Sequence, residues 1–155
     1  MKTVAIGCDP NASDLKKIVK RHLASLGHRV KDYGSDDPIY ANVAFALAKA
    51  VAAGRHDRGI LICGTGIGMS IAANKVPGAF AALVADAYSA ERSRRSNDAN
   101  IMTLGSQVVG PELAKTLVTI WLSADFDKGS RSEPKVRRIR EYERERDVGG
   151  LNRTP

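Results

Sequence analysis

The chain has 155 residues, of which 43% are hydrophobic and 26% are charged, so it is long enough for one ordinary globular core and too short for two well-sized domains. Its apolar stretches are broken well before the roughly 18 residues of a membrane helix, and its N-terminus turns polar too soon for a signal peptide, so we expect a cytoplasmic protein. The formal net charge of +7 suits nucleic acid, a membrane surface or a phosphorylated small molecule.

Short β-rich runs alternate with longer helical patterns along the chain. The runs predict strands over residues 3–8, 28–34, 58–63, 79–84 and 100–105. The helical spacing predicts helices over residues 12–27, 40–54, 68–75, 87–96, 111–123 and 133–146. Strands that alternate with helices indicate an α/β fold with a five-stranded parallel sheet covered on both faces. We expect one domain over residues 1–146, ending in a charged helix, and a flexible tail over residues 147–155.

Three polar clusters are candidates for a ligand site. Parallel sheets bind their ligands at the carboxyl ends of the strands. We expect the clusters at residues 7–9 after the first strand, 63–66 after the third strand and 96–98 before the fifth strand to lie at that edge.

A glycine loop follows the third strand and opens a helix. Its spacing, Gly64-Thr65-Gly66-Ile67-Gly68, is one residue short of the dinucleotide fingerprint and lacks the Gly-Lys-Ser/Thr ending of a phosphate-binding P-loop. Glycines at a helix N-terminus still let backbone N–H groups turn toward a ligand, where the helix dipole favours negative charge. We therefore interpret the loop as an anion cradle.

The two cysteines differ in their surroundings. Cys63 stands at the positive end of that helix, which favours a thiolate and is expected to lower the thiol pKa from its ordinary value of about 8.5. A thiolate beside an anion cradle can remove a proton or attack a carbonyl. No such loop follows Cys8, which we interpret as a small buried residue at the end of a strand. With two cysteines and no zinc-like Cys/His spacing, we expect free thiols and no metal site.

The histidines point to no catalytic arrangement. His22, His28 and His56 fall in a helix, a turn and a loop, and we expect each to be a surface or packing residue. Neither a Ser-His-Asp nor a Cys-His arrangement is evident, which disfavours a hydrolase.

Four segments carry a family resemblance: GCD at residues 7–9, GILICGTGIGMSIAANKVPG at 59–78, YSAERSRRSNDANIMTLGSQVVG at 88–110 and GSR at 129–131. Together they resemble the ribose-5-phosphate isomerase B and galactose-6-phosphate isomerase family, from residue 1 to about residue 146. The resemblance implies a Rossmann-like three-layer α/β/α sandwich. It also implies a homodimer or a dimer of dimers with active sites at the subunit interface, and no metal or organic cofactor.

The resemblance also assigns the proton-transfer chemistry. Aldose–ketose isomerisation moves a proton between C1 and C2 through a cis-enediolate, so it requires one base and a group that stabilises the oxyanion. By resemblance, Cys63 is the base, and Thr65 helps to hold the oxyanion. The backbone N–H groups of the cradle would complete that role, at Gly64, Gly66, Ile67 and Gly68.

The remaining site residues also come from the resemblance. Asp9 and Tyr40 would line the sugar hydroxyls, and Asn97 would reach in from the partner subunit. Arg131 falls at a family phosphate ligand, and Lys135 replaces a second arginine one helical turn later. Tyr40 could instead simply cap a helix face, and the two basic residues could form a solvated charge pair.

Three positions depart from the family pattern. Pro10 follows Asp9 where pentose-phosphate members have histidine, and Ser96 replaces the histidine that opens the furanose ring. Gln107 replaces a phosphate-contacting arginine. Proline has no side-chain donor, serine does not titrate near neutrality, and glutamine has no charge. The proton-abstraction residues are retained, whereas the ring-opening and phosphate-binding ends are changed.

This pattern favours a four-carbon substrate. A tetrose 4-phosphate carries its phosphate on O4, so it closes no five-membered ring and needs no ring-opening histidine. The chain also resembles the tetrulose-phosphate isomerase branch associated with erythritol catabolism, which has YAN near the second helix and Ser-Asn in place of His-Asn. We expect interconversion of D-erythrulose 4-phosphate and D-erythrose 4-phosphate, with ribose 5-phosphate and ribulose 5-phosphate as the alternative pair.

Two functions other than sugar-phosphate isomerisation remain open, nucleic-acid binding and nucleotide binding without catalysis. The basic C-terminal helix could bind nucleic acid, but its charges alternate with glutamates and its only stacking residue is Tyr142, so we expect an exposed or dimer-packing helix. A non-catalytic nucleotide module would need the glycine loop to bind phosphate. We expect a sugar phosphate as ligand, with neither nucleic acid nor a membrane as partner.

Overall fold

Five parallel strands form one sheet in the computed structural model, which describes residues 1–150 and, for residues 148–150, only the backbone. The strands are β1 (Thr3–Cys8), β2 (Arg29–Asp32), β3 (Arg58–Cys63), β4 (Ala81–Leu83) and β5 (Ile101–Gly105). Their order across the sheet is β2-β1-β3-β5-β4. The central strands β1, β3 and β5 are buried almost throughout because both of their faces are covered, whereas the edge strands β2 and β4 are shorter than expected.

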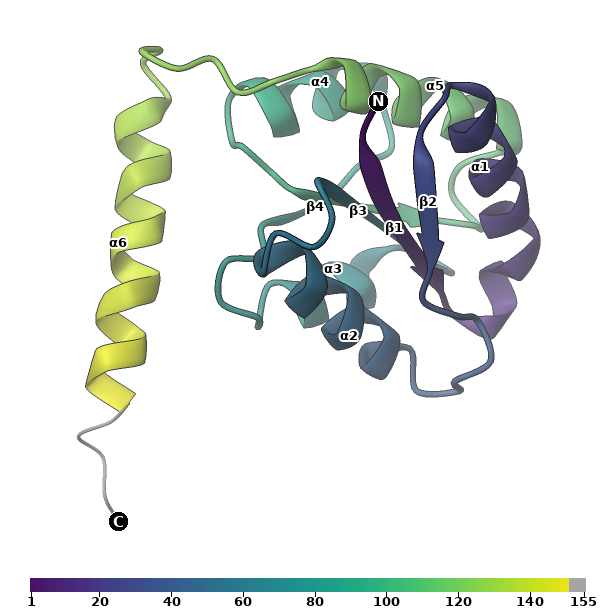
Figure 1. The fold of residues 1–155 in the computed structure, drawn as a ribbon, viewed down its shortest axis with the longest axis horizontal. Helices are drawn as coiled ribbons and strands as arrows, with labels where there is room; N and C mark the ends of the chain where they lie inside the picture. The colour runs from purple at the N-terminus through teal and green to yellow at the C-terminus, as the bar shows by residue number, and fades with distance from the viewer. Residues whose placement is uncertain (151–155) are drawn as a thin grey trace.

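Helices cover both faces of the sheet (Figure 1). One face packs against α1 (Ser13–Ser25), α4 (Ala87–Arg95) and α5 (Pro111–Ser123), and the other packs against α2 (Tyr40–Ala52) and α3 (Ile67–Ala73). Side chains alternate between the two faces along each strand, so Ile60 and Ile62 join the first core and Leu61 joins the second. The Rossmann-like α/β/α sandwich expected from the sequence is confirmed.

Local signals fix where the helices begin. Pro111 opens α5, and the Asp86 carboxylate caps α4 by accepting the N–H of Ser89 at 2.7 Å. A short 3-10 helix, η1 (Pro10–Ala12), precedes α1 and was not expected from the sequence. It forms because the Asp9 carboxylate accepts the N–H of Asn11 at 2.9 Å and Pro10 presets the backbone of the turn.

The last helix, α6 (Glu133–Gly150), leaves the three layers and runs beside the β4 edge of the molecule (Figure 1). Among its described side chains only Val136 is buried. The helix continues through residues 147–150, where the sequence predicts a tail. Ion pairs such as Arg137 with Glu141 support its exposed surface. Residues 151–155 of that expected tail lie outside the described residues. Within residues 1–150, no helix is both long enough and apolar enough to cross a membrane.

Candidate active site

Cys63 is the last residue of β3 and faces the core that α2 and α3 form with the sheet. Its side chain is 6% exposed, and its sulfur accepts the N–H of Gly66, with 3.1 Å between nitrogen and sulfur. An N–H that donates to the sulfur stabilises negative charge there. The thiol therefore lies at the mouth of the glycine loop, where a base could act.

The loop after Cys63 needs glycine at two positions. Gly66 has a φ of +79° and caps α3, and an added Cβ there would lie 2.9 Å from the backbone carbonyl carbon of Leu104. At Gly68 an added Cβ would lie 2.1 Å from the Tyr40 hydroxyl oxygen. These glycines let the loop pack against β5 and let Tyr40, the first residue of α2, lie over the first turn of α3.

The N–H groups of the loop turn toward Cys63 and Thr65. The Gly66 N–H donates to the Cys63 sulfur, and the Ile67 N–H donates to the Thr65 hydroxyl at 3.3 Å. Thr65 itself is exposed. The loop thus brings one thiol and one hydroxyl together at the N-terminus of α3, where the helix dipole favours a developing oxyanion.

Asp9 follows β1, the strand next to β3, and so lies at the same edge as Cys63. Its N–H donates to the carbonyl of Ile62 at 2.9 Å, and its carboxylate faces η1 as described above. The preceding residue, Cys8, is fully buried, and burial raises the pKa of its thiol to about 11. The interpretation of Cys8 as a packing residue is therefore confirmed.

A buried lysine that the sequence analysis did not single out supports this edge. Lys16 on α1 lies 2.8 Å from the Asp32 carboxylate, which also accepts the N–H of Gly34 at 2.9 Å. Burial raises the pKa of the Asp32 carboxyl, but hydrogen bonds from Lys16, Gly34 and Lys20 outweigh it and hold that pKa at about 2. Gly34 in turn accepts the N–H of Cys8 at 3.1 Å. The spacing of Lys16 with Val19 and Leu23 along one helical face was the signal for its burial.

Gln107 adjoins the same loop. Its N–H donates to the carbonyl of Gly64 at 3.0 Å, and a Cβ added to Gly64 would lie 3.6 Å from its amide carbon. Pro10 begins η1 directly after Asp9. Both departures from the family pattern thus lie at the carboxyl edge with Cys63.

Ser96 and Asn97 lie at the opposite edge, so the expectation that the cluster at residues 96–98 shares an edge with Cys63 is wrong. These residues follow α4 and precede β5, and a segment that enters a parallel strand lies at its amino end. Ile101 pairs with Gly59 and Gly105 pairs with Cys63, so β5 separates the two edges by roughly 13 Å at about 3.3 Å per residue. The Ser96 hydroxyl accepts the Nε–H of Arg92 at 2.8 Å, and Asn97 is exposed.

Arg131 and Lys135 belong to the amino edge as well. Two contacts hold the segment before α6 against the end of α4. The Arg95 guanidinium pairs with the Asp127 carboxylate at 3.1 Å, and the Arg95 carbonyl accepts the Asp127 N–H at 3.0 Å. Arg131 follows this anchor and Lys135 lies in the first turn of α6, and both are exposed. Within one chain, the structure groups these residues with Asn97 and keeps them apart from Cys63.

The three histidines of the chain are bonded elsewhere. His22 contacts the Thr119 hydroxyl at 2.7 Å, and His28 accepts the N–H of Lys2 at 3.1 Å. His56 lies 2.9 Å from the Tyr33 hydroxyl. None of these contacts involves a residue expected in the site.

Comparison with known proteins gives one consistent answer. The family model described as Ribose/Galactose Isomerase matches residues 4–139. D-erythrulose-4-phosphate isomerase of Pectobacterium atrosepticum is 50% identical over 147 residues, covering 92% of this chain and 96% of that protein. Ribose-5-phosphate isomerase B of Escherichia coli is 45% identical over 150 residues, covering 95% of this chain and all (100%) of that protein.

A solved structure agrees. Ribose-5-Phosphate Isomerase B of Clostridium thermocellum superposes with a TM-score of 0.87 at 43% identity, covering 92% of this chain and 98% of that one. The order of strands, the Cys63 loop and these matches over nearly the whole chain lead to one conclusion. The chain belongs to the Ribose/Galactose Isomerase family and is a sugar-phosphate isomerase.

Proposed function

We propose that this isomerase interconverts D-erythrulose 4-phosphate and D-erythrose 4-phosphate, with Cys63 as the base. The observation that carries the choice of substrate is Ser96, which stands at the ring-opening position and accepts a hydrogen bond from Arg92 at 2.8 Å. Serine does not titrate near neutrality, and all three histidines are bonded elsewhere. The 50% identity to a D-erythrulose-4-phosphate isomerase supports the same choice.

The reaction uses the groups at the carboxyl edge. The Cys63 thiolate removes a proton from C1 of the ketose, and the electron pair moves into a cis-enediolate whose negative charge lies on O2. The hydroxyl proton then passes from O1 to O2, and the Cys63 thiol returns its proton to C2 as the carbonyl forms at C1. Thr65 and the loop N–H groups, at the N-terminus of α3, hold the oxygen that becomes negative. Asp9 and Tyr40 contact the sugar hydroxyls. Arg131 and Lys135 bind the phosphate, because neither Pro10 nor Gln107 carries a charge.

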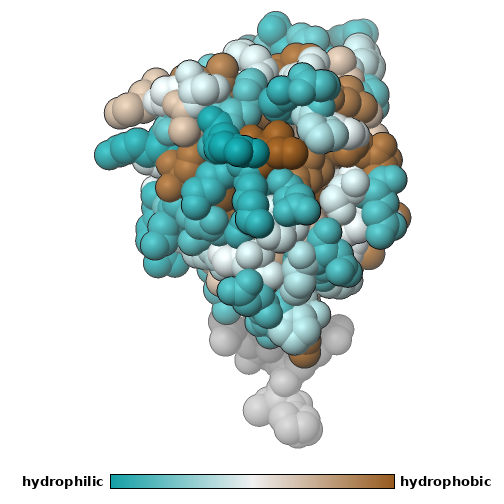
Figure 2. Space-filling model, turned by 90° about the vertical axis from the view of Figure 1, so that its right-hand side faces the viewer, coloured by the Kyte–Doolittle hydropathy of each residue, from teal (hydrophilic) through white to brown (hydrophobic). Residues whose placement is uncertain are grey.

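The separation of the two edges supports a homodimer as the working unit. Asn97, Arg131 and Lys135 of one chain would complete the site around Cys63 of the other, as two-fold symmetry allows. The exposed apolar side chains of α3, β4 and α6 offer a contact surface, at Ile67, Ile71, Leu83, Ile139 and Tyr142. The opposite face, over α1 and the β2 edge, is a mixture of hydrophilic residues with smaller hydrophobic patches between them (Figure 2). A dimer of dimers would contain two such dimers, each with the same two sites.

A kinetic comparison tests the substrate. We expect kcat/KM for D-erythrulose 4-phosphate to exceed that for ribose 5-phosphate by at least about tenfold, or roughly 1.4 kcal/mol of differential transition-state binding. The purified Cys63→Ser protein gives the background rate for both assays. Equal kcat/KM values would mean that another group opens the furanose ring, and the substrate assignment would then be wrong.

A further inference from the structure

A second cavity, of about 350 Å³, lies at the amino edge of the sheet, away from Cys63. The start of β3, the end of α4 and the middle of α6 meet there. Its charged lining residues are Arg58, Arg94, Asp98, Arg140, Glu143 and Arg144. Four guanidinium groups therefore face two carboxylates.

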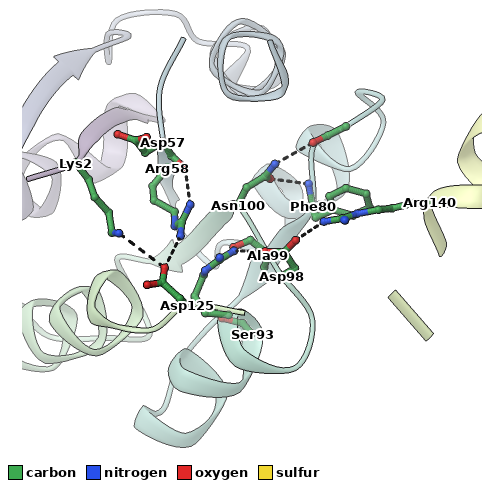
Figure 3. Close-up of polar contacts among 12 residues, drawn as sticks. Lys2, Asp57, Arg58, Phe80, Ser93, Asp98, Ala99, Asn100, Asp125 and Arg140 are labelled. Atoms are coloured by element: carbon green, nitrogen blue, oxygen red, sulfur yellow. Dashed lines mark hydrogen bonds and ion pairs between the residues drawn. The ribbon is translucent and has the colours of Figure 1, made fainter. Parts of the chain in front are cut away.

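Both carboxylates are already engaged. Asp98 pairs with Arg94 at 3.0 Å and also binds Arg140, which reaches over from α6 (Figure 3). Glu143 accepts the N–H of Gly78 at 3.0 Å. Asp98 is thus shared by two arginines, and Glu143, held by a neutral N–H, contributes the one other negative charge of the lining.

The remaining positive charge is poorly compensated. Arg58 has its acidic partner outside the cavity, in Asp125, at 3.3 Å; that carboxylate is 76% exposed and is shared with Lys2 at 3.8 Å (Figure 3). Arg144 forms no ion pair with any other described residue. The Nε groups of Arg58 and Arg94 are buried and have no hydrogen-bond acceptor among the described groups. The Arg94 side chain is only 4% exposed, so little solvent reaches it. Burial and the nearby charge of Arg94 lower the pKa of the Arg58 guanidinium.

The wall of the cavity is fixed in place. Asn100 accepts the N–H of Phe80 at 2.8 Å and donates to the carbonyl of Gly78 at 2.9 Å (Figure 3). The Arg140 guanidinium lies over the Phe80 ring, 5.4 Å from its centroid. Arginines held in this way lose little freedom when they bind an anion, which favours binding.

We propose that this cavity binds a dianionic phosphate group, at a site distinct from the phosphate site expected at Arg131 and Lys135. Guanidinium groups bind phosphate oxygens through paired, charge-assisted hydrogen bonds, and one dianion balances the excess of four arginines over two carboxylates. The volume leaves room for a short organic chain attached to the phosphate. The ligand is therefore inorganic phosphate or a small phosphate monoester.

Calorimetric titration of the full chain tests this site, with inorganic phosphate and, separately, glycerol 3-phosphate as probes. In the parent we expect two classes of site per chain. Arg58→Gln with Arg144→Gln should weaken one class by about tenfold or more, because each lost guanidinium removes a charged hydrogen bond. The control is Arg137→Gln, which removes one positive charge from α6, as Arg144→Gln does, but at an exposed position outside the cavity, and it should change nothing.

The outcomes separate this site from the active site. The Arg131→Ala variant should still bind phosphate in the cavity with the affinity of the parent, whether or not Arg131 binds the substrate phosphate. If the double variant binds like Arg137→Gln, or if Arg131→Ala removes all phosphate binding, the cavity is not a phosphate site. If circular dichroism shows that the double variant does not fold, the Arg144→Gln single variant tests the proposal. The Arg144 side chain is exposed, so this substitution should leave the fold intact. Tighter binding of glycerol 3-phosphate than of phosphate would identify a monoester as the ligand, and the reverse order would identify phosphate.

Discussion

The two edges of the sheet differ in the chemistry that they hold. The carboxyl edge carries a buried thiol, backbone N–H donors, a threonine hydroxyl and a carboxylate, all set in tight loops. The amino edge carries exposed cations and an amide on the end of α4 and the start of α6. Under the proposed mechanism, the carboxyl edge moves the proton and the amino edge binds the phosphate.

This division is informative about assembly. A sugar phosphate needs both kinds of group within the length of one small molecule, yet a strand separates them in a single chain. Two chains related by a two-fold axis bring unlike edges together twice, once at each site.

The largest effect is expected at the carboxyl edge. Cys63→Ser should lower kcat by at least about 100-fold, because serine is far too weak an acid to provide the base. The fold should persist, since a serine hydroxyl can accept the Gly66 N–H that the sulfur accepts now. Steady-state assays with circular dichroism check both statements, and Cys8→Ser, whose thiol faces the core on the other side of the sheet from Cys63, is the matched control. Near-normal turnover in folded Cys63→Ser would remove the cysteine from the mechanism.

Mixing two inactive proteins tests the pairing of unlike edges. Cys63→Ser supplies an intact amino edge, and Asn97→Ala supplies an intact Cys63. After subunit exchange at equal amounts, half of the dimers should be mixed and each should hold one complete site, so about a quarter of parental activity should return. Exchange is verified with differently tagged chains. Verified exchange without recovery would show that each site is built from one chain.

The amino edge should affect substrate binding more than turnover. Arg131→Ala should raise KM by about tenfold, and Lys135→Ala by less, because a guanidinium holds phosphate through two hydrogen bonds and an ammonium acts as a point charge. Part of the loss can fall on kcat if the phosphate also orients the sugar. Saturation curves for both variants provide the measurement, with Arg137→Ala on the same helix as control. Unchanged curves would place the substrate phosphate elsewhere.

Much of the fold could be predicted because its signals are local. The apolar run of β3 gives both of its bounds, and Pro111 gives the start of α5. The Cys63 loop could be located for the same reason, since a strand, three glycines and a helix follow each other within a few residues. These features depend on backbone geometry and burial that each segment carries in its own sequence.

Features that depend on contacts between distant segments could not be predicted. The contact of Tyr40 with Gly68 joins α2 to α3, and the pairing of Asp98 with Arg140 depends on where α6 runs. The placement of residues 96–98 was a different error. The direction of the chain through a parallel sheet already requires a segment that precedes β5 to lie at its amino end.

The smallest expected effect concerns Ser96 and Pro10, the two positions at which a family histidine is missing. Ser96→His combined with Pro10→His should raise kcat/KM for ribose 5-phosphate and narrow the preference for the tetrulose phosphate by about threefold, because the imidazole at residue 96 can transfer the protons that open a furanose. Arg92, which bonds Ser96, and the adjacent Asn97 line a cavity of about 440 Å³. The gain should be modest, because the new imidazole displaces the hydrogen bond from Arg92 and lacks partners that orient it. Paired assays on both sugars measure the ratio, and Ser96→Ala with Pro10→Ala serves as the control that removes the native side chains without adding an imidazole. If the folded histidine variant gains no more pentose activity than this alanine control, the missing histidine does not explain the substrate preference.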